Sequence, residues 1–420
     1  MRIVTLSSEQ FDKFAQSHRY RNYYQTSAYG TLMTKFGYDI FYLGIVSDTN
    51  KLIGATLILY KQVFMSNKIA YAPRGMLFNY ENAENLDEAM KKIRQVLGKK
   101  GFMLLRIDPY IPLNIRDADG RIINSNNQGN KIIENLKSVG FTYKGKTKSY
   151  ETEKPRWEGL IILDKNIEEA FSQFEKRTRN KLRKAINFGI EAYKDNTRNI
   201  EKLYSFIKDN EKKTKNYYRR ILDIFGENAE IYYAKINTET YTINSRRAYE
   251  KELENNSVLS NLIQDQSFDE KQKNNILNKK MESDKLLDSY KNSLIHATAL
   301  LKQYPEGIII GGAIVIIYDN AAFIITEGVD SKYKLQNSDY VLKWKMIEEY
   351  TKRDLKYLNI GGLVDNSDKN STHDISNERK LGFNTTVSEY IGEFDIVLNK
   401  FSYNLYKSFN GNRKNKKNQT

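Results

Sequence analysis

Short apolar runs rich in β-branched and aromatic residues recur along most of the chain, and stretches with helical spacing separate them. These runs occupy residues 41–46, 52–60, 68–72 and 102–107 in the first half, and residues 160–163, 231–236, 307–318, 321–326 and 357–360 in the second. Runs of this composition and length predict β-strands. Helical spacing occupies residues 85–97 and 340–350. The pattern therefore predicts an α/β (α+β) chain.

The two halves of the chain end on the same dipeptide. Gly140-Phe141 closes a helical stretch in the first half, and Gly382-Phe383 repeats this ending in the second. The repetition predicts two copies of one α/β domain. Between the predicted strands of the first half and Gly140, the polar, asparagine-rich residues 117–130 are expected to form a loop.

Residues 227–304 contain no glycine or proline, which predicts long helices after the strand at 231–236. One heptad seam carries Ile276, Leu287, Tyr290, Leu294, Ala297 and Leu301, with Lys280 and Ser283 as polar interruptions. A weaker seam of the same period carries Tyr249, Leu253 and Ile263. Two such seams predict an antiparallel two-helix coiled-coil arm over residues 244–303. Two ordinary surface helices are the alternative.

The length and composition of the chain limit its class. With 420 residues the chain can form two or three domains, each with its own core. Because it has no cysteine, disulfide frameworks, cysteine-ligated metals and thiol nucleophiles are excluded. The N-terminus lacks the pattern of a signal peptide, and the longest apolar run, residues 308–317, is too short to span a bilayer. We therefore expect a soluble, cytoplasmic protein.

The formal net charge of +15 is unevenly placed along the chain. Residues 244–303 are nearly neutral, with ten Lys/Arg against nine Asp/Glu, whereas residues 396–420 hold six Lys/Arg and no acid. Residues 403–420 are expected to be a disordered, solvated basic tail. Attraction of this tail to anionic lipid or RNA is the alternative.

The sequence gives little support to nucleophilic or cofactor chemistry. Only three histidines occur, at His18, His296 and His373. No Walker loop, no Gly-x-Gly-x-x-Gly and no acetyl-CoA pyrophosphate loop of the Arg-x-x-Gly-x-Gly/Ala kind is present. His373 with Asp368 and Asp374 matches no metal-ligand spacing. We expect neither a bound metal nor a cofactor.

Two basic clusters are the main candidates for binding. The first puts six cations into nine residues: Lys176, Arg177, Arg179, Lys181, Arg183 and Lys184. A basic helix of this kind can contact a phosphate backbone, and a solvated basic face is the alternative. The second cluster, at residues 212–220, interleaves Lys212 with Tyr217 and Tyr218. It can clamp a diphosphate or stack a sugar or base, and a solvated loop is the alternative.

Several separated motifs carry a resemblance to a known family. They are Tyr71-Ala72-Pro73-Arg74-Gly75, Leu104-Leu105-Arg106-Ile107-Asp108-Pro109-Tyr110, Lys380-Leu381-Gly382-Phe383 and Glu389-Tyr390-Ile391-Gly392-Glu393-Phe394. In this order they resemble the FemABX family, the bacterial aminoacyltransferases that build peptidoglycan interpeptide bridges. The resemblance extends to about residue 401 and is strongest to FemA-like members with a helical arm. It implies two tandem acetyltransferase-like (GNAT) domains that use no coenzyme A.

On this basis the chain divides into a first GNAT-like domain at residues 1–153 and a second at residues 154–243 and 304–402, with the arm at 244–303 and the tail at 403–420. The resemblance implies aminoacyl-tRNA as co-substrate and a lipid-linked or nucleotide-linked muropeptide as acceptor. The basic segment at 176–184 is then expected to contact tRNA. Contact with the inner face of the membrane, and association with a second copy or a related family member, stay open.

The resemblance also implies substrate-binding positions. Lys35 matches a lysine that ends a helix of the first domain and contacts acceptor phosphates, and Lys212 falls where an arginine often serves the same diphosphate. Asn359 precedes a Gly-Gly turn at a position that often holds Asp or Asn. The implied substrate-binding set is Lys35, Arg74, Lys212, Tyr217, Tyr218, Asn359 and Gly361.

For catalysis, Lys380 matches the lysine of the family's Phe-Lys-x-Gly-Phe/Tyr motif, with Arg379 in place of the phenylalanine. An aminoacyl ester is already activated, so the enzyme has to hold a neutral amine near the carbonyl carbon and stabilise the developing oxyanion. Lys380 can supply that charge. Asp108 is the candidate general base, and proton transfer assisted by the substrate is the alternative.

The leading hypothesis is an aminoacyltransferase that moves glycine, alanine or serine from aminoacyl-tRNA to the amine of a peptidoglycan precursor stem peptide or of a growing interpeptide bridge. One alternative is a tRNA-dependent transferase with an acceptor outside peptidoglycan. The other is an RNA-binding or scaffold relative without catalysis, which the basic clusters and Arg379 suggest.

Overall fold

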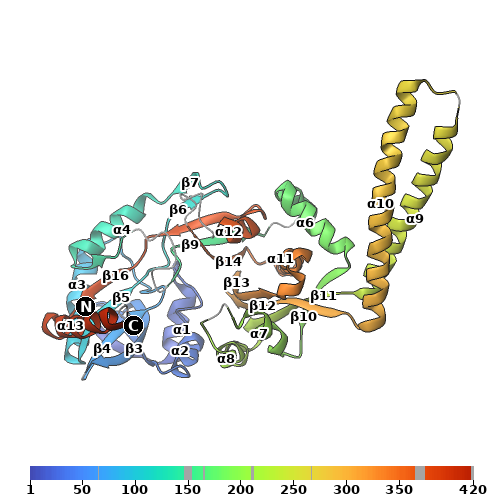
Figure 1. The fold of residues 1–420 in the computed structure, drawn as a ribbon. Helices are drawn as coiled ribbons and strands as arrows, with labels where there is room; N and C mark the ends of the chain where they lie inside the picture. Colours follow the sequence, from blue (N-terminus) through green and yellow to red (C-terminus); the bar gives the residue numbers. More distant parts are fainter. Residues whose placement is uncertain are drawn as a thin grey trace.

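The computed structural model arranges the chain as two sheet-containing units side by side, with a pair of long helices projecting from the second (Figure 1). It describes residues 1–64, 66–145, 154–163, 166–209, 212–265, 267–364 and 374–417. Because the predicted boundary at residue 153 lies outside these ranges, the division into units rests on the sheets.

The first unit contains a seven-stranded sheet. Its order is β1 (Arg2–Leu6), β2 (Asp39–Val46), β3 (Leu52–Phe64), β4 (Asn67–Ala72), β5 (Phe102–Ile107), β16 (Phe394–Val397) and β8 (Thr142–Tyr143). Among these strands β4 and β5 pair in parallel, and the other neighbours pair antiparallel. The parallel register ends at Ala72 and Ile107, so the motifs that follow these two strands meet at one edge of the sheet.

The second unit contains a nine-stranded sheet with the same plan. Its order is β10 (Ile190–Asp195), β11 (Ala229–Ile236), β12 (Ile308–Tyr318), β13 (Ala321–Val329), β14 (Tyr357–Leu363), β9 (Trp157–Ile162), β15 (Thr386–Tyr390), β6 (Pro112–Arg116) and β7 (Ile122–Ser125). Three antiparallel pairs lead to a parallel pair, β13 with β14, as in the first sheet. The predicted α/β class with two repeated units is confirmed.

Each sheet also takes strands from the other end of the chain. β6 and β7 precede the second half in sequence, yet they pair with β15 of the second sheet, and β16 returns from the C-terminal part to pair with β5 of the first. The sheets therefore do not divide at the predicted boundaries of 1–153 and 304–402. The expected loop at residues 117–130 is also wrong, since it contains β7 and the start of α4.

Helices cover both sheets. They are α1 (Ser8–Ser17), α2 (Ser27–Thr34), α3 (Ala83–Lys99) and α4 (Asn127–Ser138) in the first unit, and α5 (Ile167–Gln173), α6 (Lys176–Asn187), α7 (Glu201–Ile207), α8 (Lys215–Phe225), α11 (Ser338–Lys352) and α12 (Asp374–Leu381) in the second. Short 3-10 turns lie at Gly226–Asn228 and Ser331–Gln336. Thr26 caps α2, since its hydroxyl accepts from the Tyr29 N–H at 3.1 Å.

A shared apolar core joins the two units. Buried side chains of α1, α2 and β3, including Phe11 and Leu57, form one cluster with those of α8 and β12, including Phe225 and Ile314. Each unit also has its own core under its sheet. Because burial of apolar surface is the main stabilising contribution to folding, this cluster fixes how the two sheets face each other.

The long helices α9 (Thr238–Gln264) and α10 (Glu270–Gln303) run antiparallel, since the Thr238 hydroxyl donates to the Tyr304 carbonyl at 2.7 Å and closes the base of the pair. The expected seam residue Ala297 is fully buried. Midway along the pair the contact is polar, because the Ser283 hydroxyl donates to Glu252 at 2.5 Å. Leu253 is 47 % exposed, so its predicted place on the seam is wrong.

The C-terminal segment differs from the predicted disordered tail. It forms a helix, α13 (Lys400–Lys417). The helix begins beside β5, where the N–H of Leu398 donates to the Met103 carbonyl at 2.9 Å. The buried Ser402 fixes its first turn on the body of the first unit.

Candidate active site

A cavity of about 250 Å³ lies between the two units. Its lining is Asn22, Tyr23, Tyr24, Tyr110, Pro155, Glu158, Lys213, Tyr217, Tyr218, Phe323, Ile324, Ile325, Asn359, Gly361 and Gly362. The parallel pairing of β13 and β14 ends at Phe323 and Asn359, and the residues just after that point line the cavity from both strands. The cavity therefore lies where two parallel strands part, and the first unit closes it from the other side.

Glu158 lines the cavity and forms a buried ion pair with Arg74 of the first unit, which lies behind it and is not a lining residue. The Arg74 Nη2 donates to Glu158 Oε1 at 2.5 Å and to the Pro155 carbonyl at 2.7 Å. The two residues are 2 % and 6 % exposed. Burial lowers the pKa of Arg74, but the carboxylates of Glu158 and Asp108 outweigh this effect and hold the pKa above its ordinary value. Arg74 is thus a fixed cation.

The other oxygen of Glu158 orients two more groups. Asn359 Nδ2 donates to Glu158 Oε2 at 2.7 Å, and the Tyr390 hydroxyl donates to the same atom at 3.3 Å. Burial raises the pKa of Tyr390 well above its ordinary value, so the phenol stays protonated. Asn359 Oδ1 in turn accepts from the Gly361 N–H at 2.8 Å. One carboxylate therefore connects Arg74 to the Gly-Gly turn of β14.

The predicted base Asp108 lies next to this ion pair. Its Oδ1 accepts from the Arg74 N–H at 2.6 Å, and its Oδ2 accepts from the Tyr71 hydroxyl at 2.8 Å. Burial raises the pKa of Asp108, and Arg74 opposes this effect. Arg74 has a φ of +51°, a left-handed conformation that is costly for a residue with a side chain. The contact with Asp108 helps to hold Arg74 in it.

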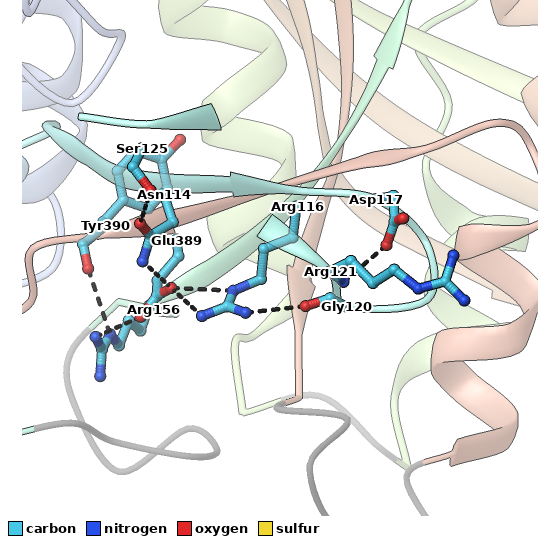
Figure 2. A network of polar contacts seen from close by, with 9 residues as sticks. All are labelled: Asn114, Arg116, Asp117, Gly120, Arg121, Ser125, Arg156, Glu389 and Tyr390. Carbon is cyan, nitrogen blue, oxygen red and sulfur yellow. Dashed lines mark hydrogen bonds and ion pairs between the residues drawn. The ribbon is translucent and has the colours of Figure 1, made fainter. Parts of the chain in front are cut away.

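Glu389, the residue before Tyr390, is held by a second polar network. Arg116 and Asn114 of β6 donate to Glu389 Oε2 at 2.9 and 2.8 Å, and Arg156 donates to Glu389 Oε1 at 2.6 Å (Figure 2). The next residue, Tyr390, stacks on Tyr110 with ring centroids 4.7 Å apart. Because Tyr110 lines the cavity, this network positions the aromatic part of the wall.

Lys380, the predicted catalytic cation, lies directly behind the Gly-Gly turn. Its Nζ donates to the Gly362 carbonyl at 2.8 Å, and a Cβ placed on Gly361 would lie 3.9 Å from it. Burial lowers the pKa of Lys380; Glu327 and Glu158 oppose this effect, and Lys343 adds to it. Lys380 is therefore a half-buried, partly desolvated amine behind the lining residues of the cavity.

Two further ion pairs involve the surroundings of Lys380, one formed by Glu327 and one by its chain neighbour Arg379. Lys343 is fully buried and donates to Glu327 Oε2 at 2.6 Å. Burial alone would raise the pKa of Glu327, but Lys343 and Lys380 lower it, so this carboxylate stays charged. Arg379, which departs from the family motif, donates to Asp339 at 2.9 Å and joins α12 to α11. Arg379 is therefore a structural cation in this chain.

Of the remaining predicted substrate-binding residues, two line the cavity and two do not. Tyr217 and Tyr218 line the cavity, and Lys35 is exposed at the end of α2, next to Phe36, whose ring lies 5.2 Å from that of Tyr217. Lys212 is not among the lining residues; its neighbour Lys213 is, with its Nζ 4.9 Å from the Tyr217 ring centroid.

Three residues that line the cavity, Lys213, Glu158 and Tyr24, are not among those predicted from the sequence. Lys213 belongs to the basic cluster at residues 212–220. The composition of the sequence therefore pointed to this segment, but the adjacent Lys212 was chosen. Glu158 precedes the predicted strand at 160–163, whereas β9 begins at Trp157. Extending the predicted strand by two residues towards the N-terminus would have included Glu158.

The six basic residues of α6 divide into two groups. Arg179 donates to the Ser172 carbonyl at 2.6 Å, and Lys181 donates to the Tyr340 hydroxyl at 3.0 Å, so both hold the helix in place. Lys176, Arg177, Arg183 and Lys184 are exposed. Arg177 lies 3.7 Å from Glu378. A surface role is therefore open to four of the six.

Within the described part of the chain, no group of three or more His, Asp or Glu side chains is arranged to hold a metal ion. In the same residues, no helix has the length and apolar character needed to cross a membrane.

Comparison with known proteins decides the family. The sequence model of the FemAB family matches residues 6–410. The chain belongs to the FemAB family. Curated relatives named lipid II:glycine glycyltransferase, from Staphylococcus epidermidis and Staphylococcus aureus, are 23 % and 21 % identical; each alignment covers 96 % of this chain and 95 % of the relative.

The crystal structure of FemX superimposes on this FemAB-family chain with a TM-score of 0.73 at 20 % identity, and covers 96 % of this chain and 99 % of its own. The FemABX resemblance and the fold inferred from the sequence are thereby confirmed. The predicted enzyme class, an aminoacyltransferase, agrees with the class of the named glycyltransferases of the FemAB family.

Proposed function

We propose that this chain transfers an amino acid, glycine, alanine or serine, from aminoacyl-tRNA to the amine of a lipid-linked peptidoglycan precursor or of a growing bridge on it. The observation that carries the proposal is the position of Lys380, a half-buried, partly desolvated amine behind the Gly-Gly turn of a cavity between the two units. The relatives named lipid II:glycine glycyltransferase support the class of acceptor.

The transfer needs no covalent enzyme intermediate. The neutral amine of the acceptor attacks the ester carbonyl carbon, a C–N bond forms, and the carbonyl oxygen becomes negatively charged. When the carbonyl re-forms, the bond to the ribose oxygen breaks, and this oxygen leaves with a proton while the amine loses one. Lys380 stabilises the negative oxygen, and its charge acts more strongly at this half-buried position than in bulk water.

We infer that Asp108 positions Arg74 and is not the base. Its two oxygens accept hydrogen bonds from Arg74 and Tyr71, and its side chain is buried. The proton can pass from the amine to the leaving ribose oxygen within the substrates, which is consistent with the absence of a partner-free carboxylate among the lining residues described.

For the acceptor, we propose that Lys213 contacts its diphosphate, with Lys35 further out at the end of α2. A hydrogen bond to a charged group contributes about 1.5–3 kcal/mol, so Lys213→Gln is expected to raise the KM for the acceptor by about tenfold or more. Lys212→Gln is the matched control and should change KM little. Steady-state kinetics with purified acceptor measures both, and equal effects of the two variants would refute the assignment.

For the donor, we propose that the exposed cations of α6 contact tRNA. Each phosphate contact releases counterions, so retention of charged tRNA should fall steeply with salt. Arg183→Gln with Lys184→Gln is expected to weaken retention and to reduce the salt slope by about two. Lys271→Gln with Lys279→Gln, on the nearly neutral arm, removes the same charge as a control. A salt response identical to that of the unmodified protein would contradict the proposed contact between α6 and tRNA.

The proposed function itself is tested by transfer. Purified protein is incubated with glycyl-, alanyl- or seryl-tRNA and with the lipid-linked or nucleotide-linked precursor, and the product is analysed by mass spectrometry. We expect one added residue on the precursor peptide. Binding of charged tRNA without transfer to either acceptor would instead support the non-catalytic alternative. Muropeptides from cells with and without the protein should differ by one bridge residue.

A further inference from the structure

α13 combines a high positive charge with exposed aromatic side chains. Its 18 residues contain six Lys/Arg and no acid. Phe401 is 75 % exposed and Phe409 is 57 % exposed. With the half-buried Leu405 they follow a spacing of i, i+4 and i+8, which places all three on one face of the helix. A binding partner of this helix would have to accommodate both the apolar row and the positive charge.

The helix is held at its start, and Asn404, Lys407, Ser408 and Phe409 after that point are exposed. The N–H groups of Leu398 and Asn399 both donate to the Met103 carbonyl, and Ser402 is buried against the first unit. From this anchor the helix presents Phe401 and the cations Lys400 and Lys407 outward. Figure 1 shows α13 at the end of the molecule opposite the paired helices α9 and α10.

We propose that α13 binds the surface of an anionic lipid bilayer, with Phe401 and Phe409 in the headgroup region and the cations against lipid phosphates. A helix with a basic polar face and aromatic side chains on the other face lies in the membrane interface and does not cross it. The charge complementarity favours lipid, since no acidic residue in α13 opposes it. Each Lys or Arg near such a surface strengthens binding by about fivefold, the equivalent of ~1 kcal/mol.

The inference goes beyond the proposed transfer, because it concerns where the protein resides and holds for any acceptor. It has a geometric consequence for that reaction. A molecule attached through α13 has the arm at its far end (Figure 1), which leaves that end accessible to a large soluble partner. An acceptor carried by a lipid would then be confined to the same surface as the enzyme.

The test uses the full-length protein and vesicles without any acceptor. We expect co-sedimentation with vesicles of phosphatidylcholine mixed with phosphatidylglycerol, little with phosphatidylcholine alone, and a loss of binding as salt increases. Lys400→Gln with Lys407→Gln should weaken binding by about 25-fold, and Phe401→Ser should weaken it without changing the charge. Lys279→Gln with Lys285→Gln, exposed on α10, is the control and should bind as the unmodified protein does.

Three results would overturn the proposal. The first is equal vesicle binding by the α13 variants and the control. The second is a loss of tRNA retention in the Lys400 and Lys407 variant with vesicle binding intact, which would assign α13 to RNA. The third is a dimer in sedimentation velocity that Phe401→Ser dissociates while vesicle binding persists, which would make α13 an interface between copies. Transfer to a soluble, nucleotide-linked acceptor is independent of α13, so its loss or retention tests the proposed function separately.

Discussion

Replacing Lys380 with methionine is expected to lower the rate of aminoacyl transfer by about 10²–10³-fold, the usual cost of removing one group that stabilises an oxyanion. Methionine keeps the length of the side chain and removes the charge behind the Gly-Gly turn, where Lys380 donates to Gly362. Single-turnover kinetics with aminoacyl-tRNA and a saturating acceptor measures the chemical step. Lys352→Met, at an exposed position of α11, is the matched control.

The same variant should not lose stability at neutral pH. The pKa of Lys380 is lowered in the folded state, mainly by burial, so below that pKa the folded protein carries the full cost of a partly desolvated cation. Between that pKa and the ordinary value of 10.5 the unfolded chain binds more protons, and stability rises with pH. Lys380→Met should therefore be at least as stable as the unmodified protein at pH 7, with the difference fading towards pH 10.5. A variant that transfers normally, or one that unfolds at pH 7, would contradict the assigned role.

Replacing Glu158 with glutamine is expected to have the largest effect on stability and to abolish transfer. It removes the carboxylate that pairs directly with the buried Arg74 guanidinium, and removal of one partner of a buried pair costs about 3–5 kcal/mol. It also releases Asn359 and Tyr390 from the carboxylate that orients them. Thermal unfolding followed by circular dichroism measures the first effect, and the transfer assay measures the second.

The double variant Arg74→Met with Glu158→Leu separates stability from function. Because it removes both charges, it should regain most of the stability that Glu158→Gln loses. Transfer should stay absent, since Asn359 has lost its partner. Recovery of transfer in the double variant would show that the pair only holds the fold. Asp108→Asn belongs to the same test: as a positioning residue it should lower kcat without changing the pH profile, whereas loss of the acidic limb would identify Asp108 as the base.

Local spacing predicted much of the fold. β5 has the predicted bounds, and β2, β4, β11 and β13 extend the predicted strands by a few residues. These elements depend on the alternation and β-branched content of their own residues, which the sequence displays directly. Lys380 could be proposed from the sequence for a similar reason, since its motif lies within a few adjacent residues.

The differences between the prediction and the structure concern which way a side chain faces and which residues it contacts. Leu253 was placed on the arm seam because it is apolar at the right period, yet Glu252 and Asn256 occupy that face through their contacts with Ser283. Lys212 was chosen because it matches an arginine position of the family, whereas the structure places the adjacent Lys213 at the cavity. In both cases a neighbouring element, not the local pattern, decides which side chain points inward.

The order of strands and helices, the repetition of one unit, the excess of positive charge and the cationic motif around Lys380 all followed from the sequence, because each depends on residues close together in the chain. The pairing of Arg74 with Glu158 and the exchange of β6, β7 and β16 between the sheets required the tertiary structure. Arg74 and Glu158 are 84 positions apart, and either forms ordinary surface contacts in other contexts. Contacts between such distant residues leave no local signal, so the cavity that they close exists only in the folded chain.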